Sequence, residues 1–171
     1  WPLAVHDQCK VINTEFKTYW GKELELPVEQ RSLVRALRLA HGAPFYVAGI
    51  FKLLHDLLMF LGPLLLSQLI GFIGDPEQPA WRGYAICFAI FWVNIAETAL
   101  LHQYFQRSFR VGMVLRSSTI ASVYEKSLNL SIGSRQQLTQ GAIVNLMAVD
   151  AQRFQDLMPY LHMVWSAPLQ I

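Results

Sequence analysis

The chain has 171 residues, of which 53% are hydrophobic and only 15% are charged, and its formal net charge is +2. Soluble domains carry about a quarter charged residues, so the composition argues against an ordinary soluble domain, and the small net charge excludes the dense basic surface of a nucleic-acid-binding protein. The two cysteines, Cys9 and Cys87, lie far apart without a C-x-x-C partner, which suits a reduced cytosol and a bilayer better than a disulfide framework.

The first 30 residues mix polar and aromatic side chains. Within them, Ile12, Phe16 and the pair Tyr19 and Trp20 recur at helical spacing, which predicts one short amphipathic helix. Pro27 separates this region from the next. The pattern leaves two interpretations open: a loosely ordered linker, and a linker whose helix docks on the rest of the protein.

Residues 31–42 predict a second short helix, which Ser32 or the residue before it caps and which Gly42 ends. Arginines occupy one face of this helix and aliphatic side chains occupy much of the other. The two sets are Arg31, Arg35 and Arg38, and Leu33, Val34, Leu37 and Ala40. Directly before an apolar run, this pattern favours a helix lying in the headgroup plane over a surface helix of a soluble domain.

From Phe45 to Ile73 the chain is almost wholly apolar, and residues 57–73 carry no charge. About 29 residues at 1.5 Å each would extend roughly 43 Å, which exceeds the hydrocarbon core of about 30 Å. We therefore expect a transmembrane helix that tilts or protrudes. Gly62 and Pro63 lie inside it and predict a kink, since proline removes a helical hydrogen bond.

Residues 74–79 are a turn-rich break that carries two acids. A second apolar run follows over residues 83–106, with Trp81 and Tyr84 as interfacial aromatic side chains at its outer edge. Because the connection is so short, the two predicted spans must be antiparallel.

Beyond Phe105 the helical periodicity continues while basic residues appear. These are Arg107, Arg110, Arg116, Lys126 and Arg135. By the positive-inside rule, residues 1–42 and about 107–158 are cytosolic, whereas the turn at Asp75 lies outside. The second helix therefore continues well past the membrane into the cytosol.

Residues 131–140 are polar, and Ser131 can cap a short helix over residues 132–138. Another helical pattern begins after Gly141 and becomes fully apolar from Tyr160 onward, which predicts the start of a third span. The chain opens without Met and stops inside this apolar run, so we expect a fragment of a longer protein. No signal-peptide pattern opens it.

Six strings, in this order along the chain, carry a family resemblance. They are Lys52-Leu-Leu-His55-Asp56, Phe60-Leu-Gly-Pro63, His102-Gln-Tyr-Phe105, Val123-Tyr-Glu-Lys-Ser-Leu128, Gly141-Ala-Ile-Val-Asn-Leu-Met-Ala-Val-Asp-Ala-Gln-Arg153 and Trp165-Ser-Ala-Pro-Leu-Gln170. Together with the order of the helices, they make residues 45–171 resemble the subfamily C ABC exporters, the multidrug resistance-associated proteins. Ala142 and Ala148 depart from the family pattern, which has Glu and Ser there.

The resemblance implies an all-α membrane protein of the type IV exporter fold, whose helices extend into the cytosol and end on nucleotide-binding domains. Residues 1–30 would then be the linker, residues 31–42 the elbow helix, and residues 43–171 the opening part of the first transmembrane domain. The short helix would be the first coupling helix. Its residues are Ile132, Gly133, Ser134, Arg135, Gln136, Gln137 and Leu138.

The resemblance further implies ATP-driven export of amphipathic organic anions, such as glutathione, glucuronate or sulfate conjugates, across the plasma or vacuolar membrane. The expected partners are the bilayer, the anionic substrate, a second transmembrane domain and nucleotide-binding domains that hold ATP and Mg²⁺. The family also includes a gated anion channel and a regulatory receptor subunit, so these roles remain alternatives. A helical membrane scaffold without an ATPase partner is a further one.

Motifs for catalysis are absent from the sequence itself. No G-x-x-x-x-G-K-[ST] string occurs, and residues 130–134 lack the double glycine of an ABC signature loop. No metal-ligand cluster or nucleophile triad is spaced convincingly. We therefore expect ATP hydrolysis to reside outside this chain, with no catalytic residue, cofactor or metal within it.

Three ionisable residues lie early in the first predicted span. Lys52 and Asp56 are four residues apart and can pair, and His55 lies on nearly the same face. An ionisable group inside a span is costly and usually faces a cavity or a partner. We expect Lys52 to bind an anionic group, His55 to donate a hydrogen bond, and Asp56 to form a structural ion pair. The alternative is a self-compensating pair that only fixes helix packing.

The resemblance assigns Lys52 and His55 to the anion-binding half of a substrate cavity and adds four further positions. Aliphatic and aromatic side chains at helical spacing are also typical of a core, and Arg153 can equally pair with a neighbouring aspartate. The predicted substrate-binding set is Lys52, His55, Leu101, Phe105, Arg153 and Tyr160.

Overall fold

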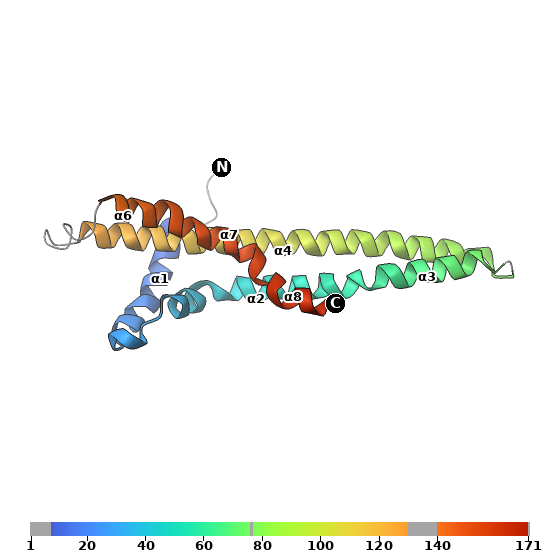
Figure 1. Ribbon diagram of the computed structural model, residues 1–171, viewed down its shortest axis with the longest axis horizontal. Coiled ribbons are helices and arrows are strands. Elements are labelled where there is room, and N and C mark those ends of the chain that lie inside the picture. The colour runs from blue at the N-terminus through green and yellow to red at the C-terminus, as the bar shows by residue number, and fades with distance from the viewer. Residues whose placement is uncertain (1–7, 76, 130–139, 171) are drawn as a thin grey trace. The chain divides into compact units, whose positions relative to one another are not determined.

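A computed structural model describes residues 8–75, 77–129 and 140–170, and every regular element within them is helical (Figure 1). The elements are α1 Cys9–Leu24, a 3₁₀ turn η2 Val28–Gln30, α2 Leu33–Met59, α3 Leu61–Ile73, α4 Ala80–Leu128, α6 Gln140–Asn145, a π-helical turn η3 Leu146–Asp150, α7 Ala151–Leu161 and α8 Met163–Leu169. The predicted all-α class is therefore confirmed. The short helix expected at residues 132–138 lies outside the described residues.

The described residues form two compact units, and each is treated by itself below. The linker unit consists of the residues up to Tyr46 together with Arg107–Leu161. The span unit consists of Val47–Gln106 together with the residues from His162 onward.

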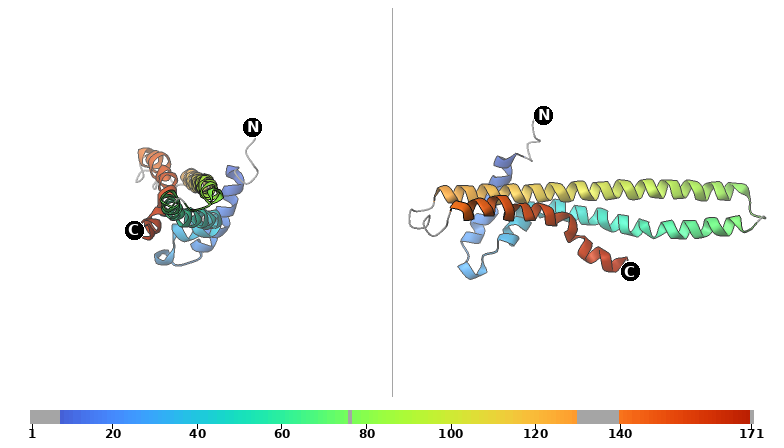
Figure 2. Two further views of the ribbon diagram at one scale, coloured as in Figure 1. Left: turned by 90° about the vertical axis from the view of Figure 1, so that its right-hand side faces the viewer. Right: turned by 45° about the horizontal axis from the view of Figure 1, so that its top comes forward.

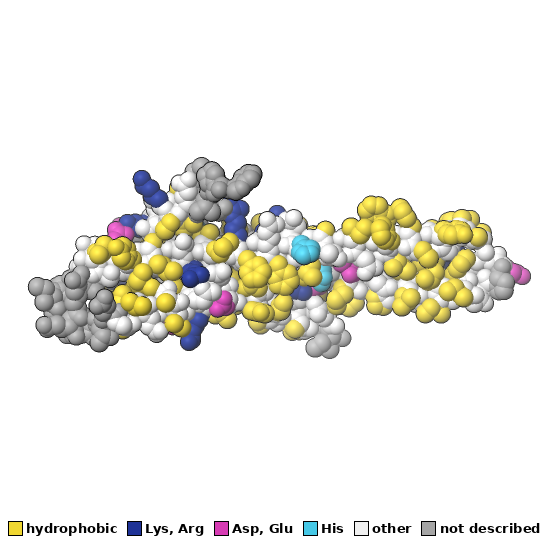
Figure 3. All heavy atoms as spheres, turned by 90° about the horizontal axis from the view of Figure 1, so that it is seen from above, with side chains coloured by type: hydrophobic (Ala, Val, Ile, Leu, Met, Phe, Trp, Pro, Cys, Tyr) yellow, Lys and Arg dark blue, Asp and Glu magenta, His cyan; other side chains and the backbone are white. Residues whose placement is uncertain are grey.

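In the span unit, the apolar helices leave most of their side chains exposed. The stretches Leu33–Ile73 and Ala80–Leu128 are each long and apolar enough to cross a membrane, and only 6% of each apolar window is buried. Figure 3 shows apolar side chains gathered over the helices α3 and α4 beside the turn at Asp75. Apolar side chains exposed to this extent are typical of helices that face lipid rather than of the core of a soluble protein.

One proline, Pro63, explains where the first span bends. Helix α2 ends at Met59 and α3 begins at Leu61, since Pro63 has no N–H to donate to the Met59 carbonyl. The kink expected at Gly62 and Pro63 therefore begins at Phe60. Helix α3 then runs beside the first part of α4 (Figures 1 and 2), where the Phe72 ring occupies the space that a side chain on Gly83 would need.

In the linker unit, the elbow region continues into the span through a kink. His41 is the residue within α2 whose backbone is not helical, with φ −132° and ψ 16°. The predicted glycine cap at Gly42 is wrong, because no glycine in the described residues has a positive φ. Pro44 lacks the N–H that would bind the Ala40 carbonyl, which weakens the helix at this bend. Ser32 does cap α2, and its Oγ accepts the N–H of Arg35 at 3.3 Å.

Helix α1 docks on the rest of the linker unit, so the docked interpretation is confirmed for the described part of the first 30 residues. Its Phe16 is 1% exposed and packs in one cluster with Ala36 and Leu37 of α2 and Val111 and Leu115 of α4. The aliphatic stripe of the elbow helix therefore faces protein at Leu37. Elsewhere on the same stripe, Val34 remains 70% exposed.

Among the three arginines of the predicted elbow helix, Arg31 and Arg35 form hydrogen bonds that fix the linker. Arg31 donates to the carbonyls of Leu24 and Leu26, each at 2.9 Å. Arg35 forms a bidentate pair with Glu23, with Nε to Oε1 at 2.5 Å and Nη2 to Oε2 at 2.6 Å. The hydrogen bonds from Arg35 hold the pKa of Glu23 below its ordinary value. Most of the predicted arginine face therefore fastens the linker to the elbow helix.

Helices α6 and α7 run alongside the second half of α4 (Figures 1 and 2). The closest approach is at Gly112, where an added Cβ would lie 2.9 Å from the Cα and 3.0 Å from the carbonyl oxygen of Gln155. Pro159 leaves this carbonyl without its usual helical donor. The backbones of α4 and α7 meet here because glycine has no side chain to separate them.

Candidate functional site

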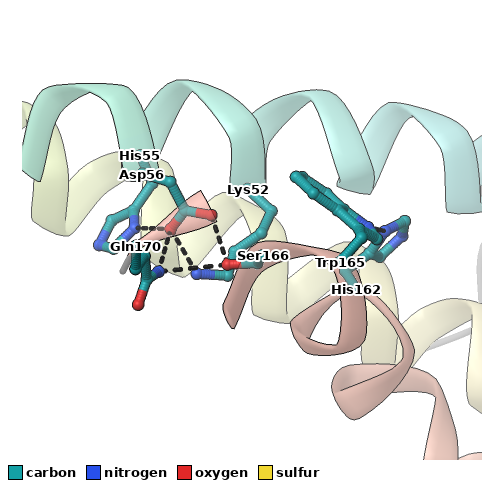
Figure 4. A network of polar contacts seen from close by, with 7 residues as sticks. All are labelled: Lys52, His55, Asp56, His162, Trp165, Ser166 and Gln170. Atoms are coloured by element: carbon teal, nitrogen blue, oxygen red, sulfur yellow. Dashed lines mark hydrogen bonds and ion pairs between the residues drawn. The ribbon is translucent and has the colours of Figure 1, made fainter. Parts of the chain in front are cut away.

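The side chain of Asp56 is the centre of a polar cluster in the span unit (Figure 4). It is fully buried, although it carries a charge and lies in a mostly apolar stretch of α2. The Lys52 ammonium donates to its Oδ1 at 2.5 Å, and the His55 Nδ1 lies 3.1 Å from the same oxygen. The pairing of Lys52 with Asp56, expected from their four-residue spacing on one helix, is therefore present.

Helix α8 supplies two more donors to the same carboxylate. The Ser166 hydroxyl donates to Asp56 Oδ2 at 2.5 Å, and the Gln170 amide donates to Oδ1 at 2.9 Å. The Gln170 amide also lies 3.2 Å from the Ser166 hydroxyl oxygen. One carboxylate thus gathers donors from both helices, which satisfies the requirement that a buried charge be paired and hydrogen-bonded.

The two helices present these groups for a simple geometric reason. Lys52 and Asp56 are four residues apart on α2, and Ser166 and Gln170 are four residues apart at the end of α8. Side chains at this spacing lie on one face of a helix, one turn apart. A polar face of α2 therefore meets a polar face at the end of α8, while most neighbouring side chains on both helices are apolar.

A second group of contacts fixes α8 next to the cluster. The His162 ring lies where a side chain on Gly49 would lie, and an added Cβ would be 2.7 Å from its Cε1. On its other sides, His162 contacts the Tyr104 ring at a centroid distance of 5.9 Å and accepts a hydrogen bond from the Trp165 indole at 3.1 Å. Gly49 thus lets an imidazole approach α2 closely, and this helps to set the position of Ser166 one turn further on.

The other predicted site residues are distributed over both units. Leu101 and Phe105 are half-buried on α4 in the span unit, where the Phe105 ring contacts that of Tyr104 at 5.1 Å. Arg153 and Tyr160 belong to the linker unit and are exposed. Arg153 has its Nε 3.9 Å from Asp150 Oδ1, with 72% of its side chain exposed. Among the predicted site residues, the structure thus brings Lys52, His55 and Asp56 into direct contact.

Sequence reasoning missed Ser166 and Gln170 as members of the cluster. Both stand in a string that carries the family resemblance, yet neither was given a role. The available signal was a hydroxyl and an amide at helical spacing in a segment expected to enter the membrane. Polar side chains in such a segment usually hydrogen-bond to another helix.

The cluster can stabilise a negative charge, and Lys52 could pair either with Asp56 or with another anion. Lys52 is 6% exposed and carries three N–H groups, of which Asp56 accepts one. The His55 side chain is 15% exposed. An anion that reached this cluster could bind Lys52, because Asp56 would still be hydrogen-bonded by the side chains of its other three neighbours. These are His55, Ser166 and Gln170.

Comparison with known proteins agrees with the helical layout. The family model for the ABC transporter transmembrane region matches residues 45–171. The chain belongs to this family. Because the matched region begins at the first span and includes the Asp56 cluster, the cluster lies inside an ABC transmembrane domain.

Relatives among curated proteins place the chain in subfamily C. It is 46% identical over 171 residues to ABC transporter C family member 8 of Dictyostelium discoideum, covering 99% of this chain and 10% of that protein. It is 41% identical over 140 residues to human ATP-binding cassette sub-family C member 3, and 45% over 139 residues to mouse sub-family C member 2, covering 82% and 81% of this chain and 9% of each relative. The chain spans about a tenth of the length of these relatives. The expected family is therefore confirmed, and the protein is a membrane protein of the ABC transporter class.

Proposed function

We propose that this chain forms part of the substrate cavity of an ATP-driven exporter of amphipathic organic anions. The supporting observation is the buried pair of Lys52 and Asp56, joined by His55, in a helix apolar enough to cross a membrane. Ionisable groups inside a membrane-spanning helix are costly and are typical of substrate and ion pathways. Glutathione, glucuronate and sulfate conjugates combine an anionic end with an apolar end, which matches a cation in apolar surroundings.

In this proposal Lys52 supplies positive charge to a carboxylate or sulfate of the substrate, and His55 donates a hydrogen bond. Leu101 and Phe105 line the apolar part of the cavity. Arg153 and Tyr160 contribute at its cytosolic mouth, where an exposed guanidinium can bind a carboxylate with two parallel hydrogen bonds. Asp56 compensates Lys52 when no substrate is bound.

The energy would come from parts of the protein outside this chain. ATP and Mg²⁺ would bind in nucleotide-binding domains, and residues 132–138 would act as a coupling helix that transmits their rigid-body motion to the spans. A second transmembrane domain would complete the cavity. We propose the plasma or vacuolar membrane as the location, with residues 1–42 and about 107–158 in the cytosol.

The decisive experiment is transport by the full-length protein carrying Lys52→Met. ATP-dependent uptake of a glutathione conjugate into inside-out vesicles should fall because one charge-assisted hydrogen bond is lost. Such a bond contributes roughly 1.5–3 kcal/mol, which corresponds to an affinity loss of about 10- to 150-fold. Since Lys52 also gives up its contact with Asp56 on binding, we expect the lower end of this range.

Lys10→Met is the matched control, because Lys10 is an exposed lysine on α1. Uptake normalised to protein level should be unchanged in this control. Equal transport by wild type and Lys52→Met would show that the ion pair only fixes helix packing. An absence of ATP-dependent uptake by the wild type would overturn the proposed function itself.

A further inference from the structure

We propose that Ser166 and Gln170 are positioning residues for substrate binding, which act by stabilising Asp56 when Lys52 turns from it to an anionic substrate. This inference rests on the proposed function, in which Lys52 binds the anion. It assigns to the end of α8 a role in setting the affinity of a site on α2. Figure 4 shows all the groups involved.

The first step in the argument is the charge on Asp56. Its carboxylate is fully buried while Lys52 contacts one of its oxygens. An unpaired carboxylate in such a place would be strongly destabilised. A substrate could recruit Lys52 alone only at that cost, unless other donors remain on Asp56.

Ser166 and Gln170 provide such donors, and they occupy both oxygens. Ser166 binds Oδ2 at 2.5 Å, while Gln170 binds Oδ1, the oxygen that Lys52 also contacts. Both side chains are neutral, so Lys52 remains the cation that attracts the anionic substrate. With these donors in place, the buried carboxylate keeps its hydrogen bonds while Lys52 exchanges one anion for another.

Removing a donor should therefore weaken anion binding even though the donor does not touch the anion. Without the Ser166 hydroxyl, Asp56 depends more on Lys52, and the release of Lys52 becomes more costly. A hydrogen bond to a charged group is strong enough for its loss to change affinity by about 10-fold. Ser166→Thr retains the hydroxyl and should restore binding.

The test is equilibrium binding of an S-aryl glutathione conjugate to the full-length protein in lipid nanodiscs without nucleotide. Ser166→Ala and Gln170→Met should each raise the Kd by about 10-fold, and the dimethyl ester of the conjugate should show a much smaller change. In a Lys52→Met background, Ser166→Ala should have no further effect, since no cation remains to be released. Ser108→Ala is the matched control, because Ser108 is also fully buried but its hydroxyl has no hydrogen-bond partner among the described residues.

The outcomes separate this inference from the proposed function. A Kd within twofold of wild type for both Ser166→Ala and Gln170→Met overturns the inference, as does an equal loss in the Lys52→Met background. No binding of the conjugate by wild type overturns it too, since Lys52 then holds no anion. Binding with the expected changes but no ATP-dependent uptake supports the inference and overturns the proposed exporter function.

Discussion

Gly112→Ala tests whether the backbone contact between α4 and α7 requires glycine. The added Cβ would lie 2.9 Å from the Gln155 Cα, whereas ordinary contacts of this kind begin at 3.4 Å. The neighbouring atoms belong to backbone, so no side-chain rotation can relieve the contact. Helix α7 would have to move away from α4 by about half an ångström, the difference between these two distances.

Two effects of opposite sign determine the result. Alanine favours a helix over glycine by about 1 kcal/mol, which alone would stabilise α4. Overpacking a well-packed contact costs about 1–3 kcal/mol. The contact also includes the Arg116 side chain, which donates to Gln155 Oε1 at 3.1 Å and would be displaced. We therefore expect Gly112→Ala to destabilise the protein by up to about 2 kcal/mol.

The assay is thermal unfolding of the full-length protein in lipid nanodiscs, with Gly21→Ala as the matched control. Gly21 lies within α1, and an added Cβ there would meet nothing within 4 Å. Its replacement should raise or leave unchanged the apparent Tm, while Gly112→Ala should lower it. The reasoning would be refuted if Gly112→Ala unfolded at the same temperature as wild type or above it.

Three further predictions concern the linker, the elbow helix and α8. Because the pKa of Glu23 is lowered in the folded protein, its contribution to stability is fully present above the ordinary value of 4.5 and is lost as the pH falls through the lowered value. The amide hydrogen-exchange rate of α1, corrected for intrinsic rates, should therefore rise when the pH falls below that value. In the Glu23→Gln variant, the amides of α1 should exchange fast already at neutral pH. Slow exchange in this variant would contradict the argument. A depth probe on Val34, which is 70% exposed, should report the membrane interface, whereas one on Leu37, which is 5% exposed, should report a protein interior; an aqueous signal from Val34 would contradict an elbow helix at the membrane. Gly49→Ala should displace the His162 ring and lower the apparent Tm, with an unchanged Tm as the opposing result.

The sequence alone was sufficient for the fold class, the family and the pairing within one helix. Apolar runs, a short acidic turn and clustered arginines depend on composition and order along the chain, so they can be read without coordinates. The pairing of Lys52 and Asp56 follows from their four-residue spacing. The proline kink was foreseen for the same reason, because a missing N–H is a property of one residue.

Contacts between helices could not be read in this way. Ser166 is 110 residues from Asp56 in the chain, and Gly112 is recognisable as a contact point only when Gln155 lies against it. The aliphatic face of the elbow helix was expected to face lipid, but at Leu37 it packs against protein. Periodicity shows that the two faces of a helix differ, but it does not show which neighbour covers each face. The sequence therefore determined the helices and their chemistry, whereas only tertiary packing decided which helices share the buried charge of Asp56, since a buried carboxylate must find its donors wherever the fold brings them.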